Sequence, residues 1–120
     1  MNYYQHHIGD FDKAIRISDL PMVYVIATHD FEFIKIGKSS NFKGRLSNIQ
    51  SGCPFELSLW CCIRTPMASE VEAELHERFA HCRTRGEWFK PDPTDLDYML
   101  DFCASTNKNV KDVRRALLQA

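Results

Sequence analysis

The stretch that decides the fold runs from Val23 to Leu46 and reads V-Y-V-I-A-T-H-D-F-E-F-I-K-I-G-K-S-S-N-F-K-G-R-L. Its first part, Val23 to Ala27, is β-branched and aromatic, which is typical of a buried strand. His29-Asp30 supplies turn residues. A second strand is then predicted from Phe31 to Ile36, followed by Gly37. Two strands joined by a short turn pair as an antiparallel hairpin.

The position of the turn predicts the register of this hairpin. A turn centred between His29 and Asp30 places Tyr24 directly opposite Lys35, and directly opposed side chains share one face of a sheet. A lysine ammonium beside a phenol stabilises the phenolate and lowers its pKa from the ordinary value of about 10. Tyr24 and Lys35 are therefore expected to form one chemical unit.

A helix is expected to begin at Asn41, whose side chain can accept from the free amides of the first turn. Gly52 and Pro54 are expected to end it. The apolar residues at helical spacing are Phe42, Leu46 and Ile49. Arg45 lies beside this stripe, so we expect it at the edge where the helix meets the sheet.

The remaining segments predict one more strand and several helices. The strand spans Phe55 to Ile63, and a helix runs from Pro66 to about Cys82 with Glu72 and His76 one turn apart. Further helices are expected at Asp10 to Ile17, Asp95 to Ala104 and Lys108 to Leu118. Trp88, next to Phe89, is interpreted as a core anchor or part of a short edge strand, in preference to a base-stacking residue.

These elements predict an α+β fold with a small three-stranded antiparallel sheet flanked by helices. Residues 1–120 are expected to form a single domain. It would consist of an N-terminal extension (1–21), a core (22–90) and additional C-terminal helices (91–120).

Composition narrows the class of protein. Hydrophobic residues make up 44% and charged residues 26% of the 120, as in ordinary soluble domains. No run approaches the roughly 18 apolar residues of a membrane span, and the N-terminus lacks the pattern of a signal peptide. The five cysteines include no C-x-x-C pair, which argues against zinc and favours reduced thiols. We expect a cytoplasmic protein without a membrane partner.

Charge is distributed unevenly along the chain. The net charge is -1, but residues 35–90 hold nine Lys or Arg against six Glu. A mildly basic middle between acidic ends permits a polyanionic partner without requiring one.

Four residues could together cleave a phosphodiester. Such hydrolysis needs a base for water, a cation at the phosphate oxygens and help for the leaving oxygen. Tyr24 with Lys35 could supply the first, and the forked guanidinium of Arg45 the second. Glu72 offers the hard oxygen that Mg²⁺ prefers. Each residue alone has a commoner structural explanation, so their combination carries the hypothesis.

Several short motifs together resemble the GIY-YIG nuclease superfamily. Met22-Val23-Tyr24 is similar to its first motif and Lys35-Ile36-Gly37 to its second. The loop and helix motif is matched by Gly37 to Phe42 with Arg45-Leu46. The chain looks most like the phage- and bacteria-associated branch with K-I-G in the second motif. That branch also has Q-S-G-x-P (Gln50 to Pro54), E-x-x-x-H (Glu72 and His76) and a closing G-E-W-F (Gly86 to Phe89).

The resemblance covers about residues 22–90 and implies a metal-dependent endonuclease acting on DNA. It implies that Tyr24 activates water, Arg45 steadies the phosphate and Glu72 holds one divalent ion, Mg²⁺ or Mn²⁺. Lys35 replaces the tyrosine of the second motif, as in some competent members. His76 is our candidate for the histidine that the family places one turn after the arginine, where this chain has Ile49. The residues expected to contact the nucleic acid are Lys38, Ser39 and Lys43.

Two alternatives stay open. The chain could be a catalytically inactive module of this fold that binds nucleic acid or protein. It could also be a small partner-binding protein that forms a homodimer through its C-terminal helices, with Leu117-Leu118 exposed.

Overall fold

A computed structural model describes residues 19–105, and the sheet at its centre has five antiparallel strands in the order β3-β1-β2-β5-β4. The strands are β1 (Met22–Thr28), β2 (Ile34–Ser39), β3 (Leu57–Arg64), β4 (Arg83–Arg85) and β5 (Trp88–Phe89). The helices are α2 (Phe42–Ser51), α3 (Ala68–Arg78), the 3-10 helix η3 (Ala80–Cys82) and a C-terminal helix described over 93–105.

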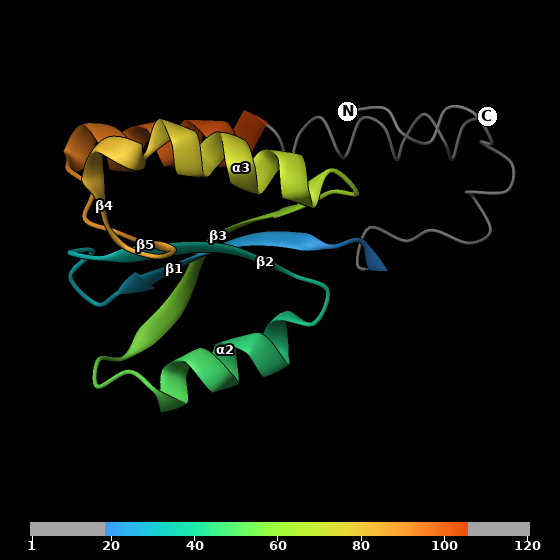
Figure 1. The fold of residues 1–120 in the computed structure, drawn as a ribbon, viewed down its shortest axis with the longest axis horizontal. Helices are drawn as coiled ribbons and strands as arrows, with labels where there is room; N and C mark the ends of the chain where they lie inside the picture. The colour runs from blue at the N-terminus through green and yellow to red at the C-terminus, as the bar shows by residue number, and fades with distance from the viewer. Residues whose placement is uncertain (1–18, 106–120) are drawn as a thin grey trace, which may run out of the picture.

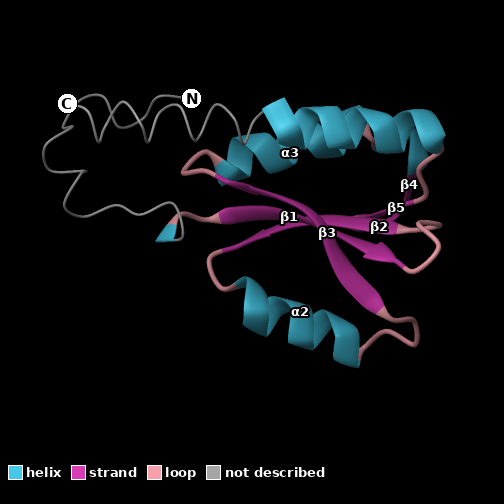
Figure 2. Ribbon diagram, turned by 180° about the vertical axis from the view of Figure 1, so that it is seen from behind, coloured by secondary structure: helices cyan, strands magenta, loops and turns pink. Residues whose placement is uncertain are grey.

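The sheet separates two helical layers (Figure 1). Figure 2 shows the same arrangement from behind, with α3 and the C-terminal helix on one side and α2 on the other. Every residue of β1 is buried, because a central strand covered on both faces needs apolar side chains on both. Val23, Val25 and Ala27 pack on the α3 side, while Tyr24 and Ile26 pack on the α2 side.

The α+β class is confirmed, but the expected three-stranded sheet was wrong, because β4 and β5 extend it. These two strands have three and two residues. Segments this short cannot display an alternating pattern, so periodicity does not reveal them. The hairpin turns at Gly86, whose φ of 57° is a conformation that glycine adopts without strain.

The register of the β1–β2 hairpin also differs from the expectation. Tyr24 lies opposite Gly37, and Lys35 lies opposite Ile26. The cause is a wider turn, in which the Asp30 carboxylate accepts from the Thr28 hydroxyl and the Glu32 amide, both at 3.0 Å. The shift is two residues in the pairing, so Tyr24 and Lys35 stay on the same face but are no longer directly opposed.

The predicted helices of the core are confirmed with small changes at their ends. The Asn41 side chain accepts from the Gly44 amide and caps α2. The C-terminal helix starts two residues before the expected Asp95. The helices expected at 10–17 and 108–118, including Leu117-Leu118, lie outside the described residues. Within 19–105, no helix has the length and apolar character needed to cross a membrane.

Gln50 holds the loop between α2 and β3. Its side-chain amide donates to the Phe55 carbonyl at 2.8 Å and accepts from the Leu57 amide at 2.8 Å. We expect Gln50→Ala to lower the free energy of unfolding by about 1–3 kcal/mol, because two backbone groups lose their partner. Urea denaturation would measure this. Asn48→Ala, an exposed change in the same helix, should alter stability by less than about 0.5 kcal/mol, and an equal loss in both variants would contradict the proposed role.

Candidate active site at the outer edge of strand β2

The Tyr24 side chain reaches across β2 because Gly37 leaves room for it. Tyr24 is 1% exposed, and its ring packs against Phe42 with centroids 5.3 Å apart. A Cβ added at Gly37 would lie 2.6 Å from Cζ of Tyr24 and 3.0 Å from Oε1 of Glu87. The phenol end of Tyr24 and the Glu87 carboxylate therefore both border the backbone of Gly37. The second motif therefore needs glycine at position 37, because any larger residue there would collide with Tyr24. The observed register, which pairs Gly37 with Tyr24, explains this requirement.

We expect Gly37→Ala to destabilise the protein by about 1–3 kcal/mol and to displace Tyr24, because the added methyl overpacks a closed site. Thermal denaturation and the near-UV signal of the tyrosine would measure both effects. Gly52→Ala is the matched control, since its nearest new contact is Ile49 O at 3.9 Å, an ordinary separation. Equal behaviour of the two variants would show that the close approach at Gly37 does not matter.

Three side chains that could bind a metal lie close together near Gly37 and the Tyr24 phenol. Glu72 and His76 come from α3, and Glu87 comes from the turn before β5. One ligand atom from each lies within 4.8 Å of the other two. The expected one-turn pairing of Glu72 and His76 on α3 is thus present, and the hairpin adds a second carboxylate to it.

His76 is fixed by the edge of β2. Its Nε2 lies 2.8 Å from the Ile36 carbonyl, while the Ile36 amide donates to the Glu87 carbonyl at 3.0 Å. A carbonyl can only accept, so Nε2 carries a proton and donates it to Ile36. The β2–β5 pairs are Ile34 with Phe89 and Lys35 with Trp88, so the Ile36 carbonyl lies beyond them and is open to the imidazole.

The Glu72 carboxylate has an unsatisfied oxygen. Its Oε2 is buried and has no hydrogen-bond partner, which is costly unless another group binds there. Burial raises the pKa of Glu72 above its ordinary 4.5, the negative charge of Glu87 raises it further, and His76 and Lys38 act in the opposite direction. The two carboxylates supply the hard oxygen ligands that Mg²⁺ and Mn²⁺ take, and the imidazole adds a nitrogen ligand that favours a first-row transition metal such as Mn²⁺. The residues present therefore fit a single divalent ion.

Lys35 does not act on Tyr24 as expected. Its ammonium lies 3.1 Å from Oε1 of Glu87, so it compensates the carboxylate. Burial raises the pKa of Tyr24 above 10.0, Glu87 and Glu72 raise it further, and only Arg45 lowers it. The expected lowering by Lys35 was wrong, because the two-residue shift in register moves the ammonium away from the phenol and towards Glu87.

The remaining predicted residues lie on β2 and at the start of α2. Arg45 is exposed on α2, and its positive charge acts on Tyr24. Lys38 donates to the Ser69 hydroxyl at 2.6 Å. Ser39 accepts from the Asn41 amide at 2.9 Å, so it organises the start of α2. Lys43 is exposed on α2.

Glu87 is the site residue that sequence reasoning missed. It belongs to the G-E-W-F motif, where the large Trp88 and Phe89 suggested a purely structural segment. Its proximity to α3 depends on the hairpin, which the sequence did not predict.

A second group of ligand-type side chains is engaged in structural contacts. His81, Cys82 and Asp95 offer atoms within 4.8 Å of one another. Asp95 and Asp92 accept from each other's amides at the start of the C-terminal helix, and Asp95 also lies 2.8 Å from His81 Nε2. The Cys82 thiol donates to a carbonyl, and burial with nearby Asp95 and Asp92 raises its pKa to about 11. This chemistry disfavours the thiolate that zinc requires.

Comparison with known proteins identifies the family. No curated protein and no solved structure matches the chain. A family model described as the T5orf172 domain matches residues 22–115, which include β1, the whole described core and every residue of the cluster at the edge of β2. Since the match spans well over half of the chain, this protein belongs to the T5orf172 domain family of phage-associated, nuclease-like domains.

Proposed function

We propose that this protein is a GIY-YIG-type endonuclease that hydrolyses DNA phosphodiester bonds with one divalent ion, Mg²⁺ or Mn²⁺. The observation that carries the proposal is the buried, unpartnered Oε2 of Glu72 beside Glu87 and His76. Membership in a nuclease-like family and the GIY-YIG resemblance of residues 22–90 support the same function.

Each site residue has its own role in the proposed hydrolysis. The Tyr24 phenolate takes the proton of the attacking water as the new P–O bond forms. Arg45 donates to the non-bridging phosphate oxygens, whose charge grows in the transition state. Glu72, His76 and Glu87 would hold the ion, which would supply positive charge to stabilise the negative charge that develops in the transition state. The P–O bond to the leaving oxygen then breaks, and that oxygen takes a proton from solvent.

Electrostatics explain why Lys35 fits this scheme. Two carboxylates beside a buried phenol oppose its ionisation. Lys35 compensates Glu87 at 3.1 Å, and a bound cation would compensate Glu72. Lys38, Ser39 and Lys43 are proposed to contact the DNA backbone, because two of them are exposed cations and all three border the start of α2.

The test is cleavage of supercoiled plasmid and branched DNA with Mg²⁺ or Mn²⁺, comparing the wild type with Tyr24→Phe, Arg45→Ala and Glu72→Ala. We expect rapid cleavage by the wild type, rates at least about a hundredfold lower for each variant, and no cleavage when EDTA is present. Activity that survives all three substitutions would refute the site.

A second candidate function is a catalytically inactive module that binds nucleic acid. The raised pKa of Tyr24 favours it, because a phenol that stays protonated is a poor base. Binding without cleavage across all substrates and both metals would support this alternative over the first.

Arg45 offers a separate prediction, because it is exposed and forms no ion pair within residues 19–105. Arg45→Ala should leave the free energy of unfolding within about 0.5 kcal/mol of the wild type. Cleavage should fall by roughly 10²–10³-fold, as when one transition-state donor is lost. Arg45→Lys should restore only part of the rate, because an ammonium lacks the forked geometry. Full activity of Arg45→Ala in a plasmid-nicking assay would exclude the role.

A further inference from the structure

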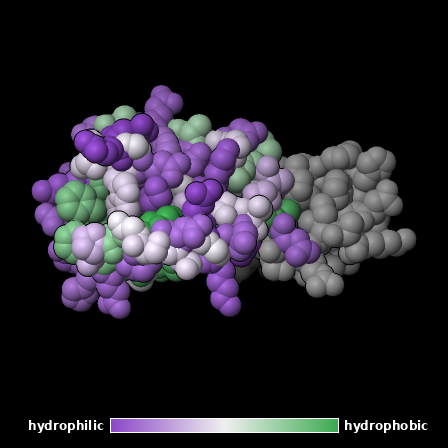
Figure 3. All heavy atoms as spheres, turned by 60° about the horizontal axis from the view of Figure 1, so that its bottom comes forward, coloured by the Kyte–Doolittle hydropathy of each residue, from purple (hydrophilic) through white to green (hydrophobic). Residues whose placement is uncertain are grey.

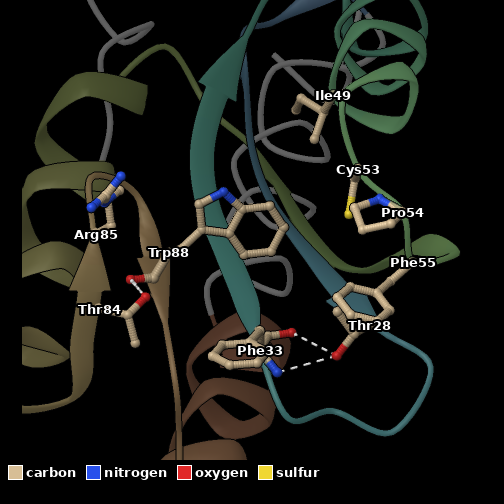
Figure 4. A pocket seen from close by; sticks show the side chains of 10 residues that line it. Thr28, Phe33, Ile49, Cys53, Pro54, Phe55, Thr84, Arg85 and Trp88 are labelled. Carbon is tan, nitrogen blue, oxygen red and sulfur yellow. Dashed lines mark hydrogen bonds between the residues drawn. The ribbon is translucent and has the colours of Figure 1, made fainter.

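An apolar pocket lies on the α2 side of the sheet, next to the cluster of Glu72, His76 and Glu87. It encloses about 340 Å³ between the end of α2, the loop that follows it and the β4–β5 hairpin. Trp88 enters from the hairpin and Phe55 from the loop on the opposite side, with Phe33 below them (Figure 4). Figure 3 shows apolar surface among polar residues on this side of the molecule, toward the end away from the grey segments.

Lys35 connects the pocket to the site. Its Nζ lies 3.1 Å from Oε1 of Glu87 and 5.6 Å from the centroid of the Trp88 ring. Glu87 Oε1 is therefore no farther from that ring than the sum of these two distances. This span corresponds to at most about three stacked nucleotides, at roughly 3.4 Å of rise each. A strand whose phosphate lies at the site can thus reach the pocket with a nearby base.

The pocket has the chemistry of a base-binding site. Phe55 is 62% exposed, so its ring is accessible to a ligand. Bases stack on such rings regardless of their sequence. Arg85 and Lys35 bring positive charge beside the rings, as the phosphates of a bound strand require. The indole Nε1–H of Trp88 has no hydrogen-bond acceptor among the described residues, so it can donate to a base edge.

Negative charge limits the direction from which a strand can approach. A neighbouring hollow, formed where the β1–β2 turn meets the loop before β3, carries three carboxylates, from Asp30, Glu32 and Glu56. They repel phosphates from that end. The positive charge beside the pocket comes instead from Arg85 and from Lys35, which also contacts Glu87 of the site.

We propose that this pocket binds one unpaired nucleobase of the strand that is cut, so that the substrate class is DNA with single-stranded or locally unpaired nucleotides. The inference rests on the proposed nuclease function. A base can stack between the Trp88 and Phe55 rings only when its faces are free of neighbouring bases, as they are in an unstacked nucleotide and not inside a duplex. An intact duplex must first unstack a base at a cost of a few kcal/mol, whereas an unpaired base enters without that cost.

Binding can be tested without cleavage by using the full chain in EDTA. In a Trp60→Phe background, Trp88 is the only tryptophan and reports directly on stacking. We expect a mixed-sequence single-stranded oligonucleotide to quench its fluorescence, whereas the matched duplex and a fully abasic strand of equal charge should not. Phe55→Ala should weaken single-strand binding roughly 5- to 100-fold in fluorescence anisotropy, from about 1–3 kcal/mol per stacked base. Phe31→Ala removes another exposed aromatic ring outside the pocket and should bind as the wild type does.

The two proposals fail separately. Cleavage by the wild type with no quenching by any strand, or with equal binding of abasic and intact strands, would overturn the base pocket and leave the nuclease standing. Quenching and the Phe55→Ala effect without cleavage would retain the pocket and refute the nuclease. Equal loss of affinity in Phe55→Ala and Phe31→Ala would also overturn the pocket.

Discussion

Replacing Glu72 with glutamine is expected to reduce metal-dependent cleavage about a hundredfold or more while leaving the fold intact. Glutamine keeps the size of the side chain but removes its charge, and the loss of about 3 kcal/mol of transition-state stabilisation gives this factor. Plasmid nicking would measure the rate, and calorimetric titration with Mn²⁺ would measure binding of the ion.

The same substitution should not destabilise the protein at pH 7. The pKa of Glu72 is raised in the fold through burial and the charge of Glu87. The folded state therefore holds this proton more tightly than the unfolded state, and the stability associated with it is lost as pH rises above 4.5 and through the raised pKa. Glu72→Gln removes that penalty, so its free energy of unfolding at pH 7 should equal or exceed that of the wild type. The difference should vanish below pH 4.5.

Glu74→Gln is the matched control, because it makes the same change at an exposed position of α3. It should leave cleavage unchanged and stability within about 0.5 kcal/mol. Equal activity losses at both positions, or a marked destabilisation by Glu72→Gln at pH 7, would contradict the assigned site.

Replacing Tyr24 with phenylalanine is expected to lower cleavage by roughly 10²–10⁴-fold, the usual contribution of a positioned base. The ring contact with Phe42 is retained, so the free energy of unfolding should change by no more than about 1 kcal/mol. Tyr98→Phe, on the C-terminal helix, is the control and should remain fully active. Equal rates for Tyr24→Phe and the wild type would remove Tyr24 from the mechanism.

The pH dependence gives an independent signature of Tyr24. Its pKa is raised above 10.0 by burial and by Glu87 and Glu72. Below that pKa, the phenolate fraction grows about tenfold per pH unit. Wild-type cleavage should therefore rise with pH from neutral to alkaline conditions at constant metal concentration, and the residual activity of Tyr24→Phe should not. A wild-type rate that is flat between pH 7 and 9 would argue against a phenolate base.

Local sequence patterns were sufficient to predict many of the strands, helix ends and site residues. The β-branched run of β1, the cap at Asn41 and the one-turn spacing of Glu72 and His76 depend on interactions between residues close in sequence. Such interactions are readable without a fold. The motifs likewise indicated Tyr24, Arg45 and Glu72 as a set before their positions were known.

The turn between β1 and β2 shows where local reasoning ended. The width of this turn is set by hydrogen bonds of the Asp30 side chain. The width shifts the β1–β2 pairing by two residues, and this shift decides whether Lys35 faces Tyr24 or Glu87. The sequence gives no distance between the turn and the Glu87 hairpin, because that distance depends on pairing across the sheet.

The sequence by itself determined the class of the fold, the order of the core elements and the set of residues on which a nuclease hypothesis rests. Only the tertiary structure decided that Gly37 opens a passage for Tyr24, that Glu87 joins Glu72 and His76, and that Lys35 pairs with Glu87. The physical reason is that a site assembled from a strand, a helix and a distant hairpin is defined by contacts between residues far apart in the chain. Those contacts follow from sheet register and from the short strands β4 and β5, which carry no periodic signal.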